Sequence, residues 1–132
     1  MLLNLTDLSS ESLQSQIIRQ IRAKILSGEL AAETDLPSIR EFARDHHVSV
    51  ITVQRAYEAL LREGLIHSRR GKGFFVSELR ENEKYKMAKQ RLRETIEPPL
   101  MAAAEEGLSS KDIIETVNLI LRQKGKKAEQ EK

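Results

Sequence analysis

The stretch VSVITVQRAYEALLREGLIHSRRGKGFFV, residues 48–76, decides the fold. Its first half repeats apolar residues at intervals of three and four, which is the period of an amphipathic helix. Ser49 is typical of a helix N-cap and Gly64 of a helix end, so we predict a helix between them. The second half places a basic, glycine-containing turn between the apolar residues 65–66 and 74–76, which predicts a β-hairpin.

Two further helices are predicted before this stretch. Apolar residues recur with the helical period over residues 13–26. Ser38 lies three residues before Glu41, which is the spacing of a capping box, so a short helix is expected from there to about residue 46. Residues 30–36 lead into a proline and are therefore expected to form an extended connector.

The composition of the chain changes at about residue 79. Three short helices and a hairpin within residues 1–78 follow the order of a winged helix-turn-helix domain. Charged, helix-favouring sequence then fills residues 79–124, where we predict a helical dimerisation region that is broken or kinked at Pro98 and Pro99. Residues 125–132 are expected to be a flexible charged tail. The predicted fold class is mainly α with a small β-hairpin.

The predicted dimerisation region is too small to bury a core alone. Its apolar residues lie in narrow stripes at the helical period, and a second copy of the chain is the simplest partner to cover them. The residues predicted at this homodimer interface are Tyr85, Leu92, Ile96, Leu100, Ile113, Ile114, Val117, Ile120 and Leu121.

The predicted helix after Ser49 has an outer face suited to reading DNA. At 100° per residue, Ile51, Gln54 and Arg55 point away from the apolar side. Gln54 and Arg55 carry hydrogen-bonding groups that match adenine and guanine edges, and Ile51 suits a thymine methyl group. The glycines of the hairpin turn allow a close approach to a minor groove. Phosphate contacts are expected from Arg40, Ser49, Thr52, Arg69, Arg70 and Lys72.

Five segments carry a resemblance to a known family: ILSGEL (25–30), LPSIREFA (36–43), VSVITVQRAYEAL (48–60), REGLI (62–66) and RRGKGFFV (69–76). In this order they resemble the DNA-binding domain of the GntR family of bacterial transcription regulators. The resemblance implies a homodimer on a roughly palindromic operator, with DNA contacts from Arg40, Ser49, Thr52, Gln54, Arg55, Tyr57, Arg70 and Gly71. The short region after the hairpin resembles the YtrA subfamily, whose members are often repressors of transporter operons.

The chain departs from the family pattern at three positions. Glu33 stands where glycine is usual, Val50 where many members have arginine, and Phe74 where threonine is common. Val50 removes a possible guanine contact, although it stays among the residues predicted to face DNA. The periodicity also puts Tyr57 on the core side of its helix, so packing is its first predicted role and a phosphate contact its second.

Composition and motifs exclude several classes of protein. The 132 residues include no cysteine, which excludes zinc fingers, iron-sulfur clusters and thiol catalysis. No apolar run has the length of a membrane span and the start lacks a leader pattern, so we expect a cytoplasmic protein without a membrane partner. Catalytic motifs are absent, which predicts no enzyme activity and no cofactor. The three histidines, His46, His47 and His67, lack the spacing of metal ligands.

Two other functions stay open beside the predicted dimeric repressor. The formal net charge is only +2, so charge alone does not identify a nucleic-acid partner. An architectural protein that coats double-stranded DNA without choosing a sequence would fit the same fold. A winged helix can also serve as a protein interaction module. No small-molecule effector is identified by the sequence.

Overall fold

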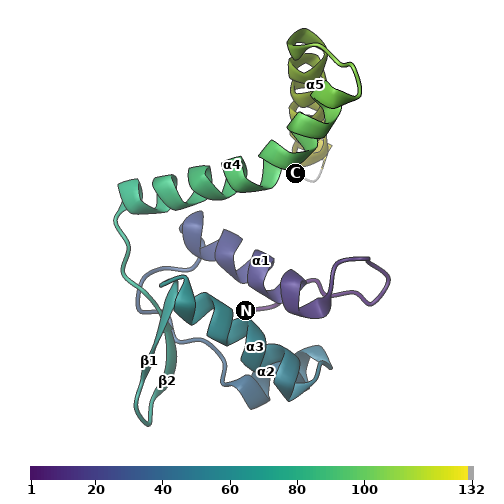
Figure 1. The fold of residues 1–132 in the computed structure, drawn as a ribbon. Coiled ribbons are helices and arrows are strands. Elements are labelled where there is room, and N and C mark those ends of the chain that lie inside the picture. The colour runs from purple at the N-terminus through teal and green to yellow at the C-terminus, as the bar shows by residue number, and fades with distance from the viewer. Residues whose placement is uncertain (131–132) are drawn as a thin grey trace. The chain divides into compact units, whose positions relative to one another are not determined.

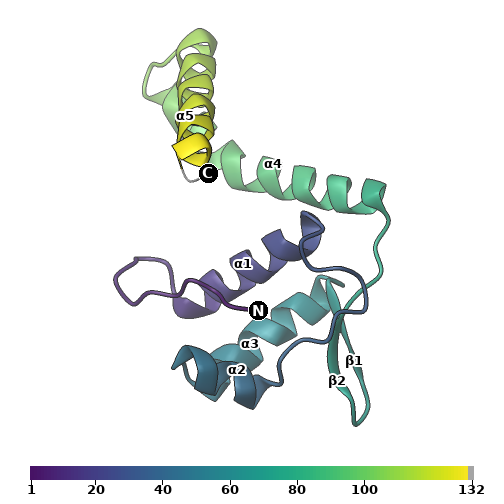
Figure 2. The ribbon, with the colours of Figure 1, turned by 180° about the vertical axis from the view of Figure 1, so that it is seen from behind.

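The computed structural model describes residues 1–130 of the chain and confirms the predicted fold class (Figure 1). In chain order its elements are α1 (Leu13–Leu26), α2 (Ile39–His46), α3 (Val50–Arg62), β1 (Ile66–Arg69), β2 (Gly73–Val76), α4 (Glu81–Glu105) and α5 (Ser110–Gln130). The chain divides into two compact units, Met1–Met87 and Ala88–Lys132. The first unit contains the three short helices and the hairpin, which Figure 2 shows from behind.

Serine is the N-cap of each of the three short helices of the first unit. Ser12, Ser38 and Ser49 are the N-caps of α1, α2 and α3, and each hydroxyl oxygen accepts a hydrogen bond of 3.1 Å from the backbone N–H three residues later. Such caps satisfy amides that have no partner inside the helix. The predicted starts of α2 and α3 are therefore confirmed.

One core holds the first unit together. Ile17, Ile21 and Ile25, spaced by four along α1, are fully buried. They share the core with Phe42 of α2, with Tyr57 of α3 and with residues of both strands. A fully buried side chain of this size contributes about 1.5–3 kcal/mol to folding, so the stripe on α1 holds that helix on the others.

The connector between α1 and α2 pairs with the hairpin. The N–H of Glu33 donates to the carbonyl of Val76 at 2.8 Å, and the N–H of Leu36 donates to the carbonyl of Phe74 at 2.9 Å. β1 pairs with β2 in antiparallel register, with Ile66 opposite Val76. The predicted extended connector therefore covers the second edge of β2.

Helix α4 passes through both prolines without ending. Pro98 and Pro99 lie inside α4, and they remove the N–H groups that would bond to the carbonyls of Glu94 and Thr95. The helix is not broken, and Figure 1 shows it bending in its second half. The predicted disturbance at the prolines is thus a bend inside one helix.

The first compact unit extends beyond the boundary predicted at residue 79. Leu79 and Met87 are half-buried and pack against the core, so the start of α4 belongs to this unit.

A second difference concerns the tail predicted over 125–132. This segment is helical as far as Gln130, because lysine, glutamate and alanine favour a helix. Residues 131 and 132 lie outside the described residues.

Helix α5 begins at a reciprocal cap. The hydroxyl oxygen of Ser109 accepts from the N–H of Asp112 at 3.1 Å, and the Asp112 carboxylate accepts from the N–H of Ser109 at 3.0 Å. These hydrogen bonds from Ser109 lower the pKa of the Asp112 carboxyl below its usual range. Among residues 1–130, no helix is both long and apolar enough to span a lipid bilayer.

Candidate nucleic-acid interface

Helix α3 presents the outer face that the sequence predicts. Val53, Ala56 and Leu60 are buried against α1 and α2, which fixes the rotation of the helix about its axis. Ile51, Gln54 and Arg55 are consequently exposed on the opposite side, Ile51 with 59% of its surface. Apolar surface exposed to water in this way is unfavourable, and a ligand that covers the isoleucine would remove this cost.

Hydroxyl groups lie at the N-terminus of α3. Ser49 accepts from the N–H of Thr52 and donates its own proton to the Thr52 hydroxyl oxygen at 2.8 Å. The hydroxyl proton of Thr52 and the partial positive charge of the helix end both favour an anion at this place. Val50 is also exposed here, with 44% of its surface.

The turn between α2 and α3 brings the two helices close to one another. His47 ends α2 in the left-handed region at φ 55°, and its N–H bonds back to the carbonyl of Arg44. Arg40 lies exposed on the first turn of α2, and it forms no ion pair with any residue that the structure describes. A cation without an intramolecular partner is available to a phosphate group.

The hairpin forms the predicted wing, with a cationic tip. Arg70, Gly71 and Lys72 connect the two strands and are all exposed. Gly71 has φ 74°, a backbone conformation that L side chains rarely adopt, and the N–H of Lys72 bonds to the carbonyl of Arg69 at 2.9 Å. Within the described chain, Arg70 and Lys72 form no ion pairs.

Arg69 has a different environment from the other cations of the wing. Its guanidinium donates to the carboxylate of Glu33, and it lies 4.6 Å from the ring centroid of Phe75. The Nε2 atom of His67 lies 3.5 Å from the same Glu33 oxygen. The sequence prediction of a phosphate contact from Arg69 did not include this carboxylate. The one available signal was that Glu33 replaces the usual glycine.

Tyr57 belongs to the core. Its side chain is fully buried, and its hydroxyl donates to the carbonyl of Pro37 at 2.8 Å. The ring lies in edge contact with Phe42 and Phe74, at centroid distances of 6.1 and 5.0 Å. Burial raises the pKa of the Tyr57 hydroxyl far above its ordinary value. The hydroxyl is therefore bonded to the backbone inside the core, where a phosphate group cannot reach it.

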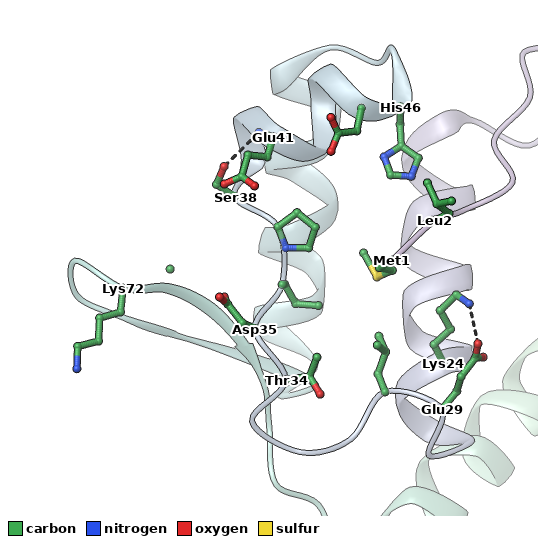
Figure 3. Close-up of a pocket in the computed structure, with 15 residues that line it drawn as sticks. Met1, Leu2, Lys24, Glu29, Thr34, Asp35, Ser38, Glu41, His46 and Lys72 are labelled. Carbon is green, nitrogen blue, oxygen red and sulfur yellow. Dashed lines mark hydrogen bonds and ion pairs between the residues drawn. The ribbon is translucent and has the colours of Figure 1, made fainter.

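An open pocket of about 700 Å³ lies between the N-terminal segment, the connector and α2 (Figure 3). Leu2, Leu36 and Pro37 contribute apolar surface, while Asp35 and Glu41 contribute carboxylates. His46 lines it as well, but its ring nitrogens are occupied by the N–H of Leu3 and the carbonyl of Phe42. Among the described residues no group of three or more histidine, aspartate or glutamate side chains could hold a metal ion.

Comparison with known protein families finds a match over most of the first unit. Residues 13–76 match the family described as "Bacterial regulatory proteins, gntR family". The chain is 34% identical over 110 residues to the uncharacterized HTH-type transcriptional regulator YhcF of Bacillus subtilis, which covers 83% of this chain and 89% of YhcF. A match of this length extends into the second compact unit.

Two other relatives from Bacillus subtilis are named as repressors. YtrA is 40% identical over 70 residues, which are 53% of this chain and 54% of YtrA. NagR is 37% identical over 75 residues, which are 57% of this chain and only 31% of NagR. The chain thus spans about half or less of the length of these two proteins.

A solved structure shares most of the fold. A GntR family transcriptional regulator from Listeria monocytogenes superposes with a TM-score of 0.70 at 26% identity, over 83% of this chain and 96% of that chain. A match of this extent includes part of the second compact unit.

Proposed function

The chain belongs to the GntR family of bacterial regulatory proteins, and from this we propose that it is a sequence-specific DNA-binding transcriptional repressor that acts as a homodimer. One observation carries the proposal: α3 is fixed by its buried side so that Ile51, Gln54 and Arg55 are exposed together. A helix in this position enters the major groove in winged helix-turn-helix proteins. YtrA and NagR, which are similar to this chain, are named as repressors.

The residues of the proposed interface divide into two roles. Gln54 and Arg55 would contact base edges, because their amide and guanidinium groups match adenine and guanine. Contacts to phosphates would come from the cap of α3, from Arg40 and from the wing tip, since these groups surround α3 without belonging to its outer face. Of the predicted phosphate contacts, the exposed residues are Arg40, Ser49, Arg69, Arg70 and Lys72, and Arg69 among them is paired with Glu33.

The second compact unit supports the proposed homodimer. Ile96, Leu100, Ile113 and Val117 of the predicted interface are half-buried within it, and none of its described residues is fully buried. The remaining residues of the second unit predicted at the interface are 58–60% exposed: Leu92, Ile114, Ile120 and Leu121. Two helices with this much apolar surface need a partner, and a second copy would place two α3 helices on successive turns of DNA, about 34–36 Å apart.

The first experiment selects genomic fragments with the full-length protein at physiological salt and measures the stoichiometry of the best fragment. We expect to find an inverted repeat that binds two chains and lies upstream of genes that the protein represses. The resemblance to YtrA makes a transporter operon the expected target. Binding without enrichment of any sequence would replace this proposal by an architectural function, and an absence of binding would favour a protein interaction module.

A matched pair of variants tests which part of α3 contacts the bases. Arg55→Ala removes a group from the exposed N-terminal half of α3, whereas Arg62→Ala removes the same group from its last turn. Loss of a base contact costs about 1–3 kcal/mol, so Arg55→Ala should weaken binding to the selected fragment roughly 5- to 150-fold for each chain of the dimer. The Arg62→Ala protein should bind nearly as the unchanged protein does. Equal losses in both variants would contradict the proposed orientation of α3.

Another matched pair tests the dimer. Leu121 and Leu119 are 60% and 51% exposed, but they lie about 160° apart around α5, and only Leu121 belongs to the predicted interface. Leu121→Glu should convert the protein to monomers in analytical ultracentrifugation, while Leu119→Glu should not. A dimer that survives Leu121→Glu unchanged would place the interface elsewhere.

A further inference from the structure

Glu33 and Arg69 are far apart in the sequence but meet at the base of the wing. The guanidinium of Arg69 donates through Nη2 to Oε2 of Glu33. Both side chains remain about half exposed, with 49% for Arg69 and 45% for Glu33. The pair therefore lies on the surface, where a phosphate group could compete for the same guanidinium.

Two groups hold Arg69 in place, and His67 contacts both of them. The ring of Phe75 lies under the guanidinium, with 4.6 Å from its carbon to the ring centroid. His67 is roughly stacked on the same ring at 6.0 Å and brings its Nε2 to 3.5 Å from the Glu33 carboxylate. Because the aromatic ring already restricts the guanidinium, forming the ion pair with Glu33 costs less side-chain entropy than it would for a freely rotating arginine.

The backbone of Glu33 fixes the position of its carboxylate. Its N–H is bonded to the carbonyl of Val76 at 2.8 Å, so the residue is attached to β2. Its φ is 66°, in the left-handed region where a side chain is strained and glycine is not. Strain of this kind persists when the surroundings or the function of the residue require it.

We propose that Glu33 is a positioning residue that withholds Arg69 from the DNA backbone. The inference rests on the proposed DNA-binding function and refines the role of the wing. The wing then offers two phosphate-binding cations, Arg70 and Lys72, because the charge of Arg69 is neutralised within the protein. Glu33 thereby lowers the sequence-independent part of the affinity and leaves base reading by α3 unchanged.

The test measures binding of the full-length protein to the selected genomic fragment and to a random duplex of equal length, between about 50 and 200 mM salt. Glu33→Gln should bind both duplexes more tightly at low salt. One additional phosphate contact in each chain of the homodimer steepens the salt slope by about 1.8, so the loss of affinity over this fourfold salt range should grow about 12-fold. Glu78→Gln is the matched control, because it removes one exposed negative charge that forms no ion pair within the described chain.

A double-mutant cycle connects the effect to Arg69. The double variant Glu33→Gln with Arg69→Ala removes both charges of the pair, so it should bind within about twofold of the unchanged protein and lose the whole gain seen in Glu33→Gln. Glu33→Gly removes the carboxylate and the backbone strain together, and it should reproduce the steeper slope. This second variant keeps the test valid if Glu33→Gln folds poorly.

Two results would overturn the inference while leaving the proposed function intact. The first is that the double variant loses as much affinity relative to the unchanged protein as Lys72→Ala does, which would mean that Arg69 already contacts DNA. The second is that Glu33→Gln and Glu78→Gln behave alike. If the unchanged protein binds neither duplex, the proposed function fails and this inference fails with it.

Discussion

The ion pair between α1 and α3 leads to a prediction about the stability of the first unit. Arg22 is 8% exposed, and its Nε and Nη2 atoms donate to the two carboxylate oxygens of Glu63 at 2.9 and 3.0 Å. Glu63 is the C-cap of α3, where the helix dipole disfavours a negative charge. Removing Arg22 would therefore leave a carboxylate in an unfavourable place without its partner.

The expected cost follows from the exposure of the two groups. Breaking a fully buried pair costs about 3–5 kcal/mol, because one charge remains desolvated. The Glu63 side chain keeps 30% of its exposure, so water can partly replace the lost partner, and we expect about 2 kcal/mol for Arg22→Met. Glu63→Gln should cost a similar amount, whereas the double variant should cost clearly less than the sum. The coupling energy would be about 1–2 kcal/mol.

Urea unfolding followed by tyrosine fluorescence measures these free energies. The chain contains two tyrosines, so a Tyr85→Phe background leaves Tyr57 as a probe inside the core of the first unit. The pair of Arg19 with Glu11 is a matched control, since Arg19 also donates through Nε and Nη2 to both carboxylate oxygens, but its side chain is 57% exposed. We expect a smaller coupling there, because solvent screens the charges. Additive effects of Arg22→Met and Glu63→Gln, within about 0.5 kcal/mol, would refute the reasoning.

Three further predictions concern single positions. Tyr57→Phe should destabilise the first unit by about 1–2 kcal/mol in urea unfolding, because the Pro37 carbonyl loses its donor. The raised pKa of Tyr57 means that the folded state keeps this proton at a pH where the unfolded state loses it. The contribution of Tyr57 to stability should therefore be constant below about pH 10 and decrease above it; an unchanged decrease in Tyr57→Phe would contradict this cause. His47→Gly should stabilise the first unit by about 0.5–1 kcal/mol, seen as a higher melting temperature, because glycine adopts φ 55° without strain. A lower melting temperature would show that the imidazole stabilises the fold by more than the relief of backbone strain does. Ser49→Ala should cost about 1 kcal/mol in urea unfolding through loss of the α3 cap, and no loss would mean that water replaces the hydroxyl.

Local patterns were enough to predict the helices and the hairpin. Ser38 and Ser49 mark the starts of α2 and α3 because capping depends on residues within one turn of each other. The exposure of Gln54 and Arg55 followed from the helical period in the same way. These features depend on near neighbours in the chain, which is why a single sequence reveals them.

Features that depend on distant residues were not predicted. The pair of Glu33 with Arg69 joins positions 36 residues apart, and no local pattern indicates it. The contact of Met87 with the core moved the boundary of the first unit for the same reason. Local sequence predicted a break or a kink at Pro98 and Pro99 but not which of the two; α4 continues through both prolines and bends (Figure 1).

The pairing of the connector with β2 has a consequence for the order of folding. The hydrogen bond from Glu33 to Val76 closes a loop of more than forty residues, whereas each helix forms from near neighbours. We expect the helices to collapse first and the base of the wing to close after the rate-limiting barrier. Substitutions at this pairing should then accelerate unfolding and leave the refolding rate almost unchanged, so the wing governs how long the domain stays folded rather than how fast it folds.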